Sequence, residues 1–303
     1  MSTLDDPLHF HPDTASGLTS MLSGTASSGR PAARAVVQPG KVWLVGAGPG
    51  DPELLTMKAA RVLQQARLVL YDHLVSREVV RLAGSGADLI YVGKEAGRHT
   101  LPQGELCALM VRLAREGRSM VRLKGGDPYV FGRGGEEAQA LAAAGVPFEV
   151  VPGISAAQGA AAACGIPLTH RDHAAALVLV TGHAREDGGC RRGGDPDPLG
   201  ETDWAALARP HQTVVFYMGL SRLSLIAARL VAHGMDPHTP AALVENATTA
   251  HQRCVRGVLV DMPALAHAHG VQAPALLMVG GVVGLQSALA PLMAARPPAE
   301  ALA

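Results

Sequence analysis

The sequence predicts an α/β protein with two domains, the first built on a mainly parallel sheet and the second on a mixed one. From Lys41 onward, short apolar runs alternate with longer amphipathic stretches, a pattern typical of strands and helices that alternate along the chain. At 303 residues the chain also exceeds the length, about 250 residues, at which single cores stop growing. We therefore expect two cores.

The first domain is expected to contain five strands, most of them followed by a helix. Each predicted strand is almost entirely apolar, as expected where helices cover both faces of a parallel sheet. The predicted ranges are 42–45, 68–71, 89–92, 120–123 and 148–151.

A second set of strands follows the helix-breaking sequence Gly165-Ile166-Pro167. The predicted ranges are 176–180, 214–217, 242–245, 253–259 and 276–279. The two strands around Glu245 and Arg253 lack a connection long enough for a helix, so they are expected to pair antiparallel. The second sheet should therefore be mixed.

These ranges predict the organisation of the whole chain. Residues 1–39 are rich in Ser, Thr, Gly, Ala and Pro without periodicity, and are interpreted as a disordered tail. The first domain is expected over 40–168, the second over 169–290, and a flexible tail over 291–303. Within the second domain, residues 184–201 are interpreted as a mobile loop.

Composition narrows the classes of partner. Lysine plus arginine and aspartate plus glutamate each number 26, so no bulk charge favours nucleic acid. The longest apolar runs, near 174–180 and 275–279, fall far below the ~20 residues of a membrane-spanning helix. The four cysteines include no C-x-x-C pair, and we expect neither a disulfide framework nor a metal site. With no signal-like N-terminus, the expected location is the cytoplasm.

The first predicted strand ends in a glycine-rich segment, 46–53, with Pro52 placed to open a helix. Ligands of open α/β sheets bind beyond the carboxyl ends of strands, so this segment is a candidate binding loop. The sequence signals for a dinucleotide-binding loop disagree with one another. Asp72 stands where a ribose-binding acid would, but Asp51 replaces a glycine at a helix start that would face pyrophosphate. Asp51 is about equally consistent with a helix cap.

Two further glycine-rich segments follow predicted strands, at 125–137 and 151–157. The first of these combines five glycines with Arg133 and Glu136, more than a plain turn requires. In the second, Ser155 precedes a helix and is either its cap or a ligand donor. We expect the three segments to converge on one small-molecule cleft at a sheet edge.

Taken together, these segments closely resemble the uroporphyrinogen-III C-methyltransferases, members of the tetrapyrrole methylase fold. The resemblance covers about residues 40–289. Its most specific parts are VGAGPGDPELLT at 45–56, VRLKGGDPYVFGRGGEE at 121–137 and GIPLTHR at 165–171. It implies an active site between the two domains, a homodimer, and two methylations of uroporphyrinogen III, at C-2 and C-7, that give precorrin-2 for sirohaem and cobalamin biosynthesis.

The resemblance also implies which residues form the site. The methyl donor would be S-adenosyl-L-methionine, converted to S-adenosyl-L-homocysteine, and the binding residues carried over by motif are Pro49, Gly125, Gly126, Asp127, Val130, Ser155, Ala156, Met218, Ala247 and Ala275.

The predicted catalytic residues are Asp72, Arg133, Glu136 and Arg171. The two arginines would bind carboxylates of the tetrapyrrole, because a guanidinium forms paired hydrogen bonds with a carboxylate. Asp72 or Glu136 would accept the proton lost after methylation, and Glu136 could instead hold Arg133 in place. Lys94 and Lys124 could assist, although a solvated surface position is slightly favoured for each.

Three rival functions remain at this stage: a methyltransferase acting on a later precorrin, an NAD-dependent dehydrogenase, and a non-catalytic nucleotide-binding module. Asp51 counts against the second. The charged residues grouped in FGRGGEE and THR count against the third, because passive nucleotide binding does not need them.

Overall fold

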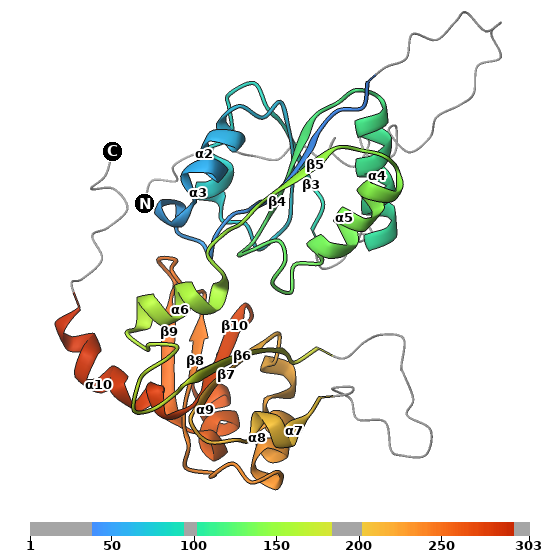
Figure 1. The fold of residues 1–303 in the computed structure, drawn as a ribbon. Coiled ribbons are helices and arrows are strands. Elements are labelled where there is room, and N and C mark those ends of the chain that lie inside the picture. Colours follow the sequence, from blue (N-terminus) through green and yellow to red (C-terminus); the bar gives the residue numbers. More distant parts are fainter. Residues whose placement is uncertain (1–37, 94–101, 184–201, 294–303) are drawn as a thin grey trace, which may run out of the picture.

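The computed structural model describes residues 38–93, 102–183 and 202–293. Within these ranges the chain forms two five-stranded sheets, and helices pack on both faces of each sheet. The two sheets belong to separate lobes, one formed by the first half of the chain and one by the second (Figure 1). The predicted α/β class and the pair of sheets are confirmed.

The first sheet is parallel throughout, with the order β3-β2-β4-β1-β5. Its strands are β1 (Val42–Gly46), β2 (Leu68–Tyr71), β3 (Asp88–Tyr91), β4 (Met120–Lys124) and β5 (Phe148–Val151). Each predicted range is correct to within one residue at either end. The order makes β4, β1 and β5 neighbours, so the three strands that run into glycine-rich segments end side by side.

Helices cover both faces of this sheet because the parallel strands are apolar on both sides. On one face pack α2 (Met57–Gln64) and α3 (Arg77–Val80), and on the other α4 (Gln103–Arg115) and α5 (Gly134–Ala143). The helix predicted near Pro52 is a short 3-10 helix, η1 (Pro52–Leu54), and Asp51 caps it by accepting a hydrogen bond from the amide of Glu53.

The second sheet is mixed, as predicted, with the order β6-β7-β10-β8-β9. Its strands are β6 (Ala176–Thr181), β7 (Gln212–Tyr217), β8 (Pro240–Glu245), β9 (Arg253–Val258) and β10 (Ala275–Val279). The β6–β7 pair is parallel and the other pairs are antiparallel, including the predicted β8–β9 pair. Consequently β7 and β8 end at the same sheet edge at which β10 begins.

One face of the second sheet is covered by α7 (Trp204–Leu207), α8 (Leu223–Ala232) and α9 (Met262–Ala268). The other face is covered by α6 (Ala156–Cys164) and the 3-10 helix η4 (Gly281–Leu285), whose apolar side chains join one cluster with the strands. Because α6 packs on the second sheet, we propose a domain boundary at about 152–155, earlier than the 168/169 boundary expected from the sequence.

The remaining short helices connect these layers. They are η2 (Leu220–Arg222), η3 (Leu259–Asp261), α10 (Gln286–Leu289) and η5 (Ala290–Leu292). The predicted tail over 291–303 therefore begins within η5, and its residues from 294 onward lie outside the described residues. The predicted N-terminal tail, apart from residues 38 and 39, and the predicted loop at 184–201 also lie outside them. In the described part of the chain, no helix has the length and apolar character to cross a membrane.

Candidate active site where the two domains meet

The three glycine-rich segments meet at the carboxyl edge of the first sheet. Gly48 and Gly126 form an antiparallel bridge, with amide-to-carbonyl distances of 3.2 and 2.7 Å. A Cβ atom at Gly46 would lie 2.6 Å from the amide nitrogen of Gly153, and one at Gly153 would lie 2.3 Å from the carbonyl oxygen of Gly126. Only glycine permits such close approach of three backbones. The segments therefore form one packed unit.

Asp127 ties the second segment to the third. One carboxylate oxygen accepts a hydrogen bond from the amide of Gly153 at 3.0 Å, and the other accepts one from the amide of Tyr129 at 2.8 Å. The family resemblance implies a role in cofactor binding for Asp127. In the structure both of its oxygens hold backbone amides, so its observed contacts fix the shape of the loops.

On the second domain, the residues predicted to bind the cofactor lie along one sheet edge. Met218 follows β7, Ala247 follows β8, and Ala275 opens β10 opposite Glu245. Met218 has a positive φ of 55°, and its side chain is half exposed. Such left-handed backbone at a non-glycine residue carries strain that is often found at binding sites.

The first glycine segment contacts this edge directly. The amide of Asp51 donates a hydrogen bond to the Thr248 hydroxyl at 3.2 Å. A Cβ atom at Gly159 of α6 would lie 2.4 Å from Cγ of Pro49, so Pro49 rests against the helix backbone. The loop after β1 is thus held between α6 and the turn after β8.

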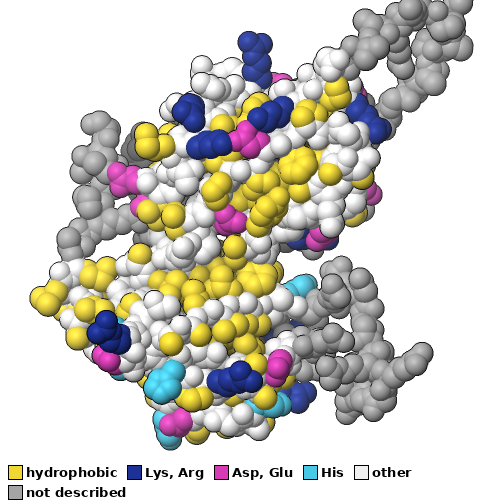
Figure 2. Space-filling model, in the orientation of Figure 1, with side chains coloured by type: hydrophobic (Ala, Val, Ile, Leu, Met, Phe, Trp, Pro, Cys, Tyr) yellow, Lys and Arg dark blue, Asp and Glu magenta, His cyan; other side chains and the backbone are white. Residues whose placement is uncertain are grey.

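The second glycine segment also reaches the second domain. The rings of Phe131 and Tyr217 lie 4.8 Å apart, and Val130 packs against the apolar cluster beneath α6. The Tyr217 hydroxyl accepts a hydrogen bond from the amide of Ala157 at 2.9 Å. Every predicted cofactor-binding residue therefore lies in the segments that meet at the junction of the two domains. Figure 2 shows hydrophobic side chains gathered on the second domain beside the waist between the lobes.

The structure assigns Ser155 the role of helix cap, one of the two roles left open by the sequence. Its hydroxyl accepts a hydrogen bond from the amide of Gln158 at 3.4 Å, and the Gln158 side chain accepts one from the Ser155 amide at 3.1 Å. This reciprocal pair is a capping box. The cap fixes the first turn of α6, including Ala156, against the glycine segments.

Asp72 stands directly after β2, next to the glycine-rich unit. One of its oxygens accepts a hydrogen bond from the amide of Leu74, and the other accepts one from Nη2 of Arg122, both at 3.1 Å. A Cβ atom at Gly125 would lie 2.7 Å from Cβ of Leu74, so the turn that carries Asp72 touches the second glycine segment. Its carboxylate is held at both oxygens beside the candidate site.

Behind Asp72 lies a buried group of charges that sequence reasoning missed. Nε of Arg122 and Nζ of Lys124 both donate to Oε1 of Glu137, at 3.2 and 2.9 Å. The surface position favoured for Lys124 is wrong, because that residue is only 3% exposed. Arg122 and Glu137 were not singled out, although a charged residue inside an otherwise apolar strand was a usable signal.

Burial has a clear electrostatic effect on Lys124. Desolvation lowers the pKa of its ammonium group most strongly, and the nearby charge of Arg122 lowers it further. The Glu137 carboxylate opposes this shift. The ion pair thus favours the charged form of a lysine that burial alone would push towards neutrality.

Arg133 and Glu136 lie at the start of α5 and pair through two hydrogen bonds, of 2.9 and 2.7 Å. The pair lowers the pKa of the Glu136 carboxyl and raises that of the Arg133 guanidinium. Both side chains are more than half exposed, so an external carboxylate can reach the arginine. The two hydrogen bonds between Arg133 and Glu136 agree with the alternative in which Glu136 holds Arg133 in place.

Arg171 is not brought to this junction. It lies in the turn closed by the His170–Ala174 bridge, where the amide of Ala175 donates to the carbonyl of His211 before β7. Met218 follows the opposite end of β7. The length of the second sheet therefore separates Arg171 from the glycine segments. Lys94 lies outside the described residues.

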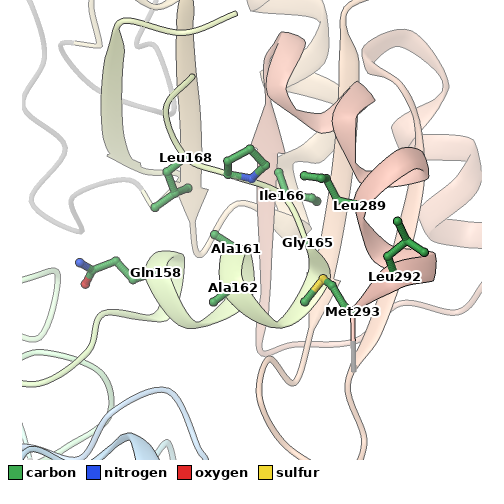
Figure 3. Close-up of a pocket in the computed structure, with 10 residues that line it drawn as sticks. Gln158, Ala161, Ala162, Gly165, Ile166, Leu168, Leu289, Leu292 and Met293 are labelled. Atoms are coloured by element: carbon green, nitrogen blue, oxygen red, sulfur yellow. The ribbon is translucent and has the colours of Figure 1, made fainter. Parts of the chain in front are cut away.

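A shallow apolar pocket of about 540 Å³ lies elsewhere on the second domain, along the outer side of α6 (Figure 3). It is lined by Gln158, Ala161, Ala162, Gly165, Ile166, Pro167, Leu168, Leu289, Leu292 and Met293. The lining includes none of the glycine segments after β1, β4 and β5. This pocket is separate from the candidate active site.

Comparison with known proteins agrees with this arrangement. Residues 41–263 match the tetrapyrrole (corrin/porphyrin) methylases. The chain belongs to the tetrapyrrole methylase family. A siroheme synthase of Thioalkalivibrio sulfidiphilus is 52% identical over 250 residues, which are 82% of this chain and 49% of that protein. This methylase chain thus spans about half the length of that relative.

Solved structures of the family have the same fold. The native uroporphyrin III C-methyl transferase of Thermus thermophilus is 43% identical with a TM-score of 0.67, covering 81% of this chain and all of that one. A structure of the same enzyme complexed with S-adenyl homocysteine is 42% identical, with the same TM-score and coverage. The dehydrogenase reading is wrong, because the first sheet lacks the 3-2-1 strand order of dinucleotide-binding folds.

Proposed function

We propose that this methylase transfers methyl groups from S-adenosyl-L-methionine to C-2 and C-7 of uroporphyrinogen III, giving precorrin-2 for sirohaem and cobalamin biosynthesis. The observation that carries the proposal is the meeting of three glycine segments with the Met218, Ala247 and Ala275 edge. This arrangement occurs in a chain that matches the full length of a uroporphyrin III C-methyl transferase from Thermus thermophilus.

The junction suits this cofactor better than a dinucleotide. The junction combines the backbone amides and carbonyls of the glycine segments with half-exposed Met218 and the small side chains of Ala247 and Ala275. Backbone groups can bind an adenine and an amino-acid end, whereas the Asp51 carboxylate would repel a pyrophosphate. The proposed cofactor-binding residues therefore follow the ends of β1, β4, β5, β7 and β8 or open β10. They are Pro49, Gly125, Gly126, Asp127, Val130, Ser155, Ala156, Met218, Ala247 and Ala275.

The bound cofactor supplies a methyl group activated by a positively charged sulfur. The protein contributes mainly position, because holding donor and acceptor in line can lower a barrier by about 7–11 kcal/mol. Nε and Nη2 of Arg133 donate to Glu136, and the remaining N–H groups of the exposed guanidinium bind a substrate carboxylate. Asp72 accepts the proton that the macrocycle loses elsewhere after methylation, since an arginine stays protonated and cannot act as the base. Arg171 has no role at this site, because it lies at the opposite end of the second sheet.

The experiment is a methyl-transfer assay with purified protein, S-adenosyl-L-methionine and uroporphyrinogen III. We expect precorrin-2 with two added methyl groups, seen by its absorbance and mass, together with S-adenosyl-L-homocysteine. The Asp72→Asn variant should lose about 100-fold or more in kcat, as general acid–base catalysis contributes about 10²–10⁴-fold. The surface variant Asp88→Asn should retain full rate. Transfer only to a later precorrin would support the rival methyltransferase function instead.

We also propose that the enzyme is a cytoplasmic homodimer. The resemblance to uroporphyrinogen-III C-methyltransferases supports the dimer, and the absence of C-x-x-C pairs fits a reducing compartment. Light scattering on the purified chain tests the dimer, and fractionation of the source cells tests the compartment. A monomeric mass at micromolar concentration would contradict the first proposal.

A further inference from the structure

Four charged residues of the first domain form what we call the buried charge cluster: Asp72, Arg122, Lys124 and Glu137. We propose that Arg122 and Glu137 are positioning residues that hold the Asp72 carboxylate in the orientation needed to accept the substrate proton. This inference rests on the role proposed for Asp72 above.

The cluster is costly for the fold. The side chains of Arg122 and Lys124 on β4 and of Glu137 on α5 are 5%, 4% and 0% exposed. Removing charges from water carries a large penalty, and replacing buried ion pairs with apolar residues is often neutral or stabilising. Stability therefore gives a weak reason for placing these charges here.

The hydrogen bonding of Glu137 is also unbalanced. Arg122, Lys124 and Gln103 all donate to Oε1, whereas Oε2 is buried and has no hydrogen-bond partner among the described residues 38–93, 102–183 and 202–293. A cluster shaped for stability alone would use both oxygens. The arrangement instead directs one oxygen at the side chain of Arg122.

Arg122 is the member of the buried charge cluster that can fix the orientation of the Asp72 carboxylate. Its Nε donates to Glu137, its Nη1 donates to the carbonyl of Leu123, and its Nη2 donates to Asp72. Because a guanidinium is planar and rigid, three acceptors in different directions fix its plane. The plane then fixes the Asp72 oxygen that it contacts.

Asp72 is the most accessible member of the cluster, with a side chain 20% exposed, compared with 5% or less for the others. Its second oxygen is held by the amide of Leu74, in the turn that touches Gly125. The cluster thus runs from a buried interior to one accessible carboxylate beside the second glycine segment. A base held at both oxygens cannot rotate away from its proton.

The cluster contains two cations and two anions. A test of it must therefore keep the buried charges balanced. Removing Glu137 alone would leave two buried cations with one partner, and such a variant could unfold. The combined variant Arg122→Met with Glu137→Gln removes one charge of each sign and keeps an oxygen for Lys124. A second variant, Arg122→Lys, keeps the charge but lacks the planar fork.

The experiment measures kcat and KM for uroporphyrinogen III, the Kd for S-adenosyl-L-homocysteine, and Tm. We expect each variant to lower kcat about 10- to 100-fold, because misplacement of a reacting group by about 1 Å has that effect. We expect KM and the Kd to change less than threefold, and Tm to show a folded protein. In an Asp72→Asn background the same substitutions should cause no further loss of kcat.

Three outcomes would overturn the inference. Unchanged kcat in both variants would show that Asp72 needs no positioning. An equal loss in the Asp72 and Asp72→Asn backgrounds would show that the cluster acts on something else. Unchanged kcat for Asp72→Asn alone would remove the role of Asp72, and with it this inference, while leaving the methyltransferase function standing.

Discussion

Single side chains hold the candidate site together by binding backbone. Asp127 cross-links two glycine segments, Ser155 caps α6, and Thr248 accepts the amide of Asp51. These roles follow from the residue types, because short polar side chains favour caps and turns. The partners were not predictable, since Gly153 and Asp127 are 26 residues apart. At this scale the sequence named Asp127 and Ser155 but not Thr248, and the tertiary structure supplied the contacts of all three.

The first prediction concerns Asp127. In Asp127→Asn one acceptor oxygen becomes an NH₂ group that faces a backbone amide, so one hydrogen bond is lost and two donors oppose each other. We expect the free energy of unfolding to fall by about 1–3 kcal/mol. The Kd for S-adenosyl-L-homocysteine should rise about tenfold, equivalent to ~1.4 kcal/mol. Urea unfolding and calorimetric titration measure the two effects.

The matched control is Asp88→Asn, in which an exposed carboxylate that pairs with Arg118 at the surface is removed. Exposed pairs contribute about 0–1 kcal/mol, so this variant should behave nearly as wild type in both measurements. Equal effects of the two substitutions would show that Asp127 does not organise the loops.

At the scale of elements, α6 joins the two domains. The helix follows β5 of the first sheet but packs its Ala157, Ala160 and Ala161 against the second sheet. Its small residues allow close packing, and Gly159 leaves room for Pro49. The sequence predicted the helix, and it left Ser155 open between the helix cap and a ligand donor. It could not assign the helix to a sheet, because an alanine-rich helix has no strongly polar face that would reveal which side is buried.

The second prediction concerns this contact. In Gly159→Ala the new methyl group would lie 2.4 Å from Cγ and 2.6 Å from Cβ of Pro49. The proline ring cannot rotate away, so we expect the overpacking to cost about 1–3 kcal/mol of stability. The displaced loop should also raise the Kd for S-adenosyl-L-homocysteine about tenfold, equivalent to ~1.4 kcal/mol.

Gly104→Ala in α4 provides the comparison, because no atom of the described part of the chain lies within 4 Å of its added Cβ atom. There the gain in helix propensity should stabilise the protein by about 0.5–1 kcal/mol and leave the Kd unchanged. Tighter cofactor binding by Gly159→Ala would contradict the packing described here.

At the scale of the whole molecule, the order of strands decides which segments come together at the junction of the two domains. The order β3-β2-β4-β1-β5 places the ends of β4, β1 and β5 side by side, and the mixed second sheet brings the ends of β7 and β8 to the start of β10. A ligand at the junction contacts both domains. Its binding must therefore stabilise both of them together.

The third prediction follows from that coupling. S-Adenosyl-L-homocysteine at about 100 times its Kd should stabilise the protein by ~2.7 kcal/mol. For a protein of this size we expect Tm to rise by roughly 4–6 °C. Hydrogen exchange should slow both in the glycine segments and around 218 and 246–248. Protection confined to one domain would place the ligand away from the junction.

The sequence by itself determined the α/β class, the strands to within about two residues, the mixed second sheet and the three glycine segments. These features depend on local composition and periodicity, which any short window of the chain contains. Only the tertiary structure decided that α6 belongs to the second sheet, that Lys124 is buried with Arg122 and Glu137, and that Arg171 lies far from the junction. Those outcomes depend on strand order and packing between distant segments, and the free energy of such contacts is not encoded in any one stretch of residues.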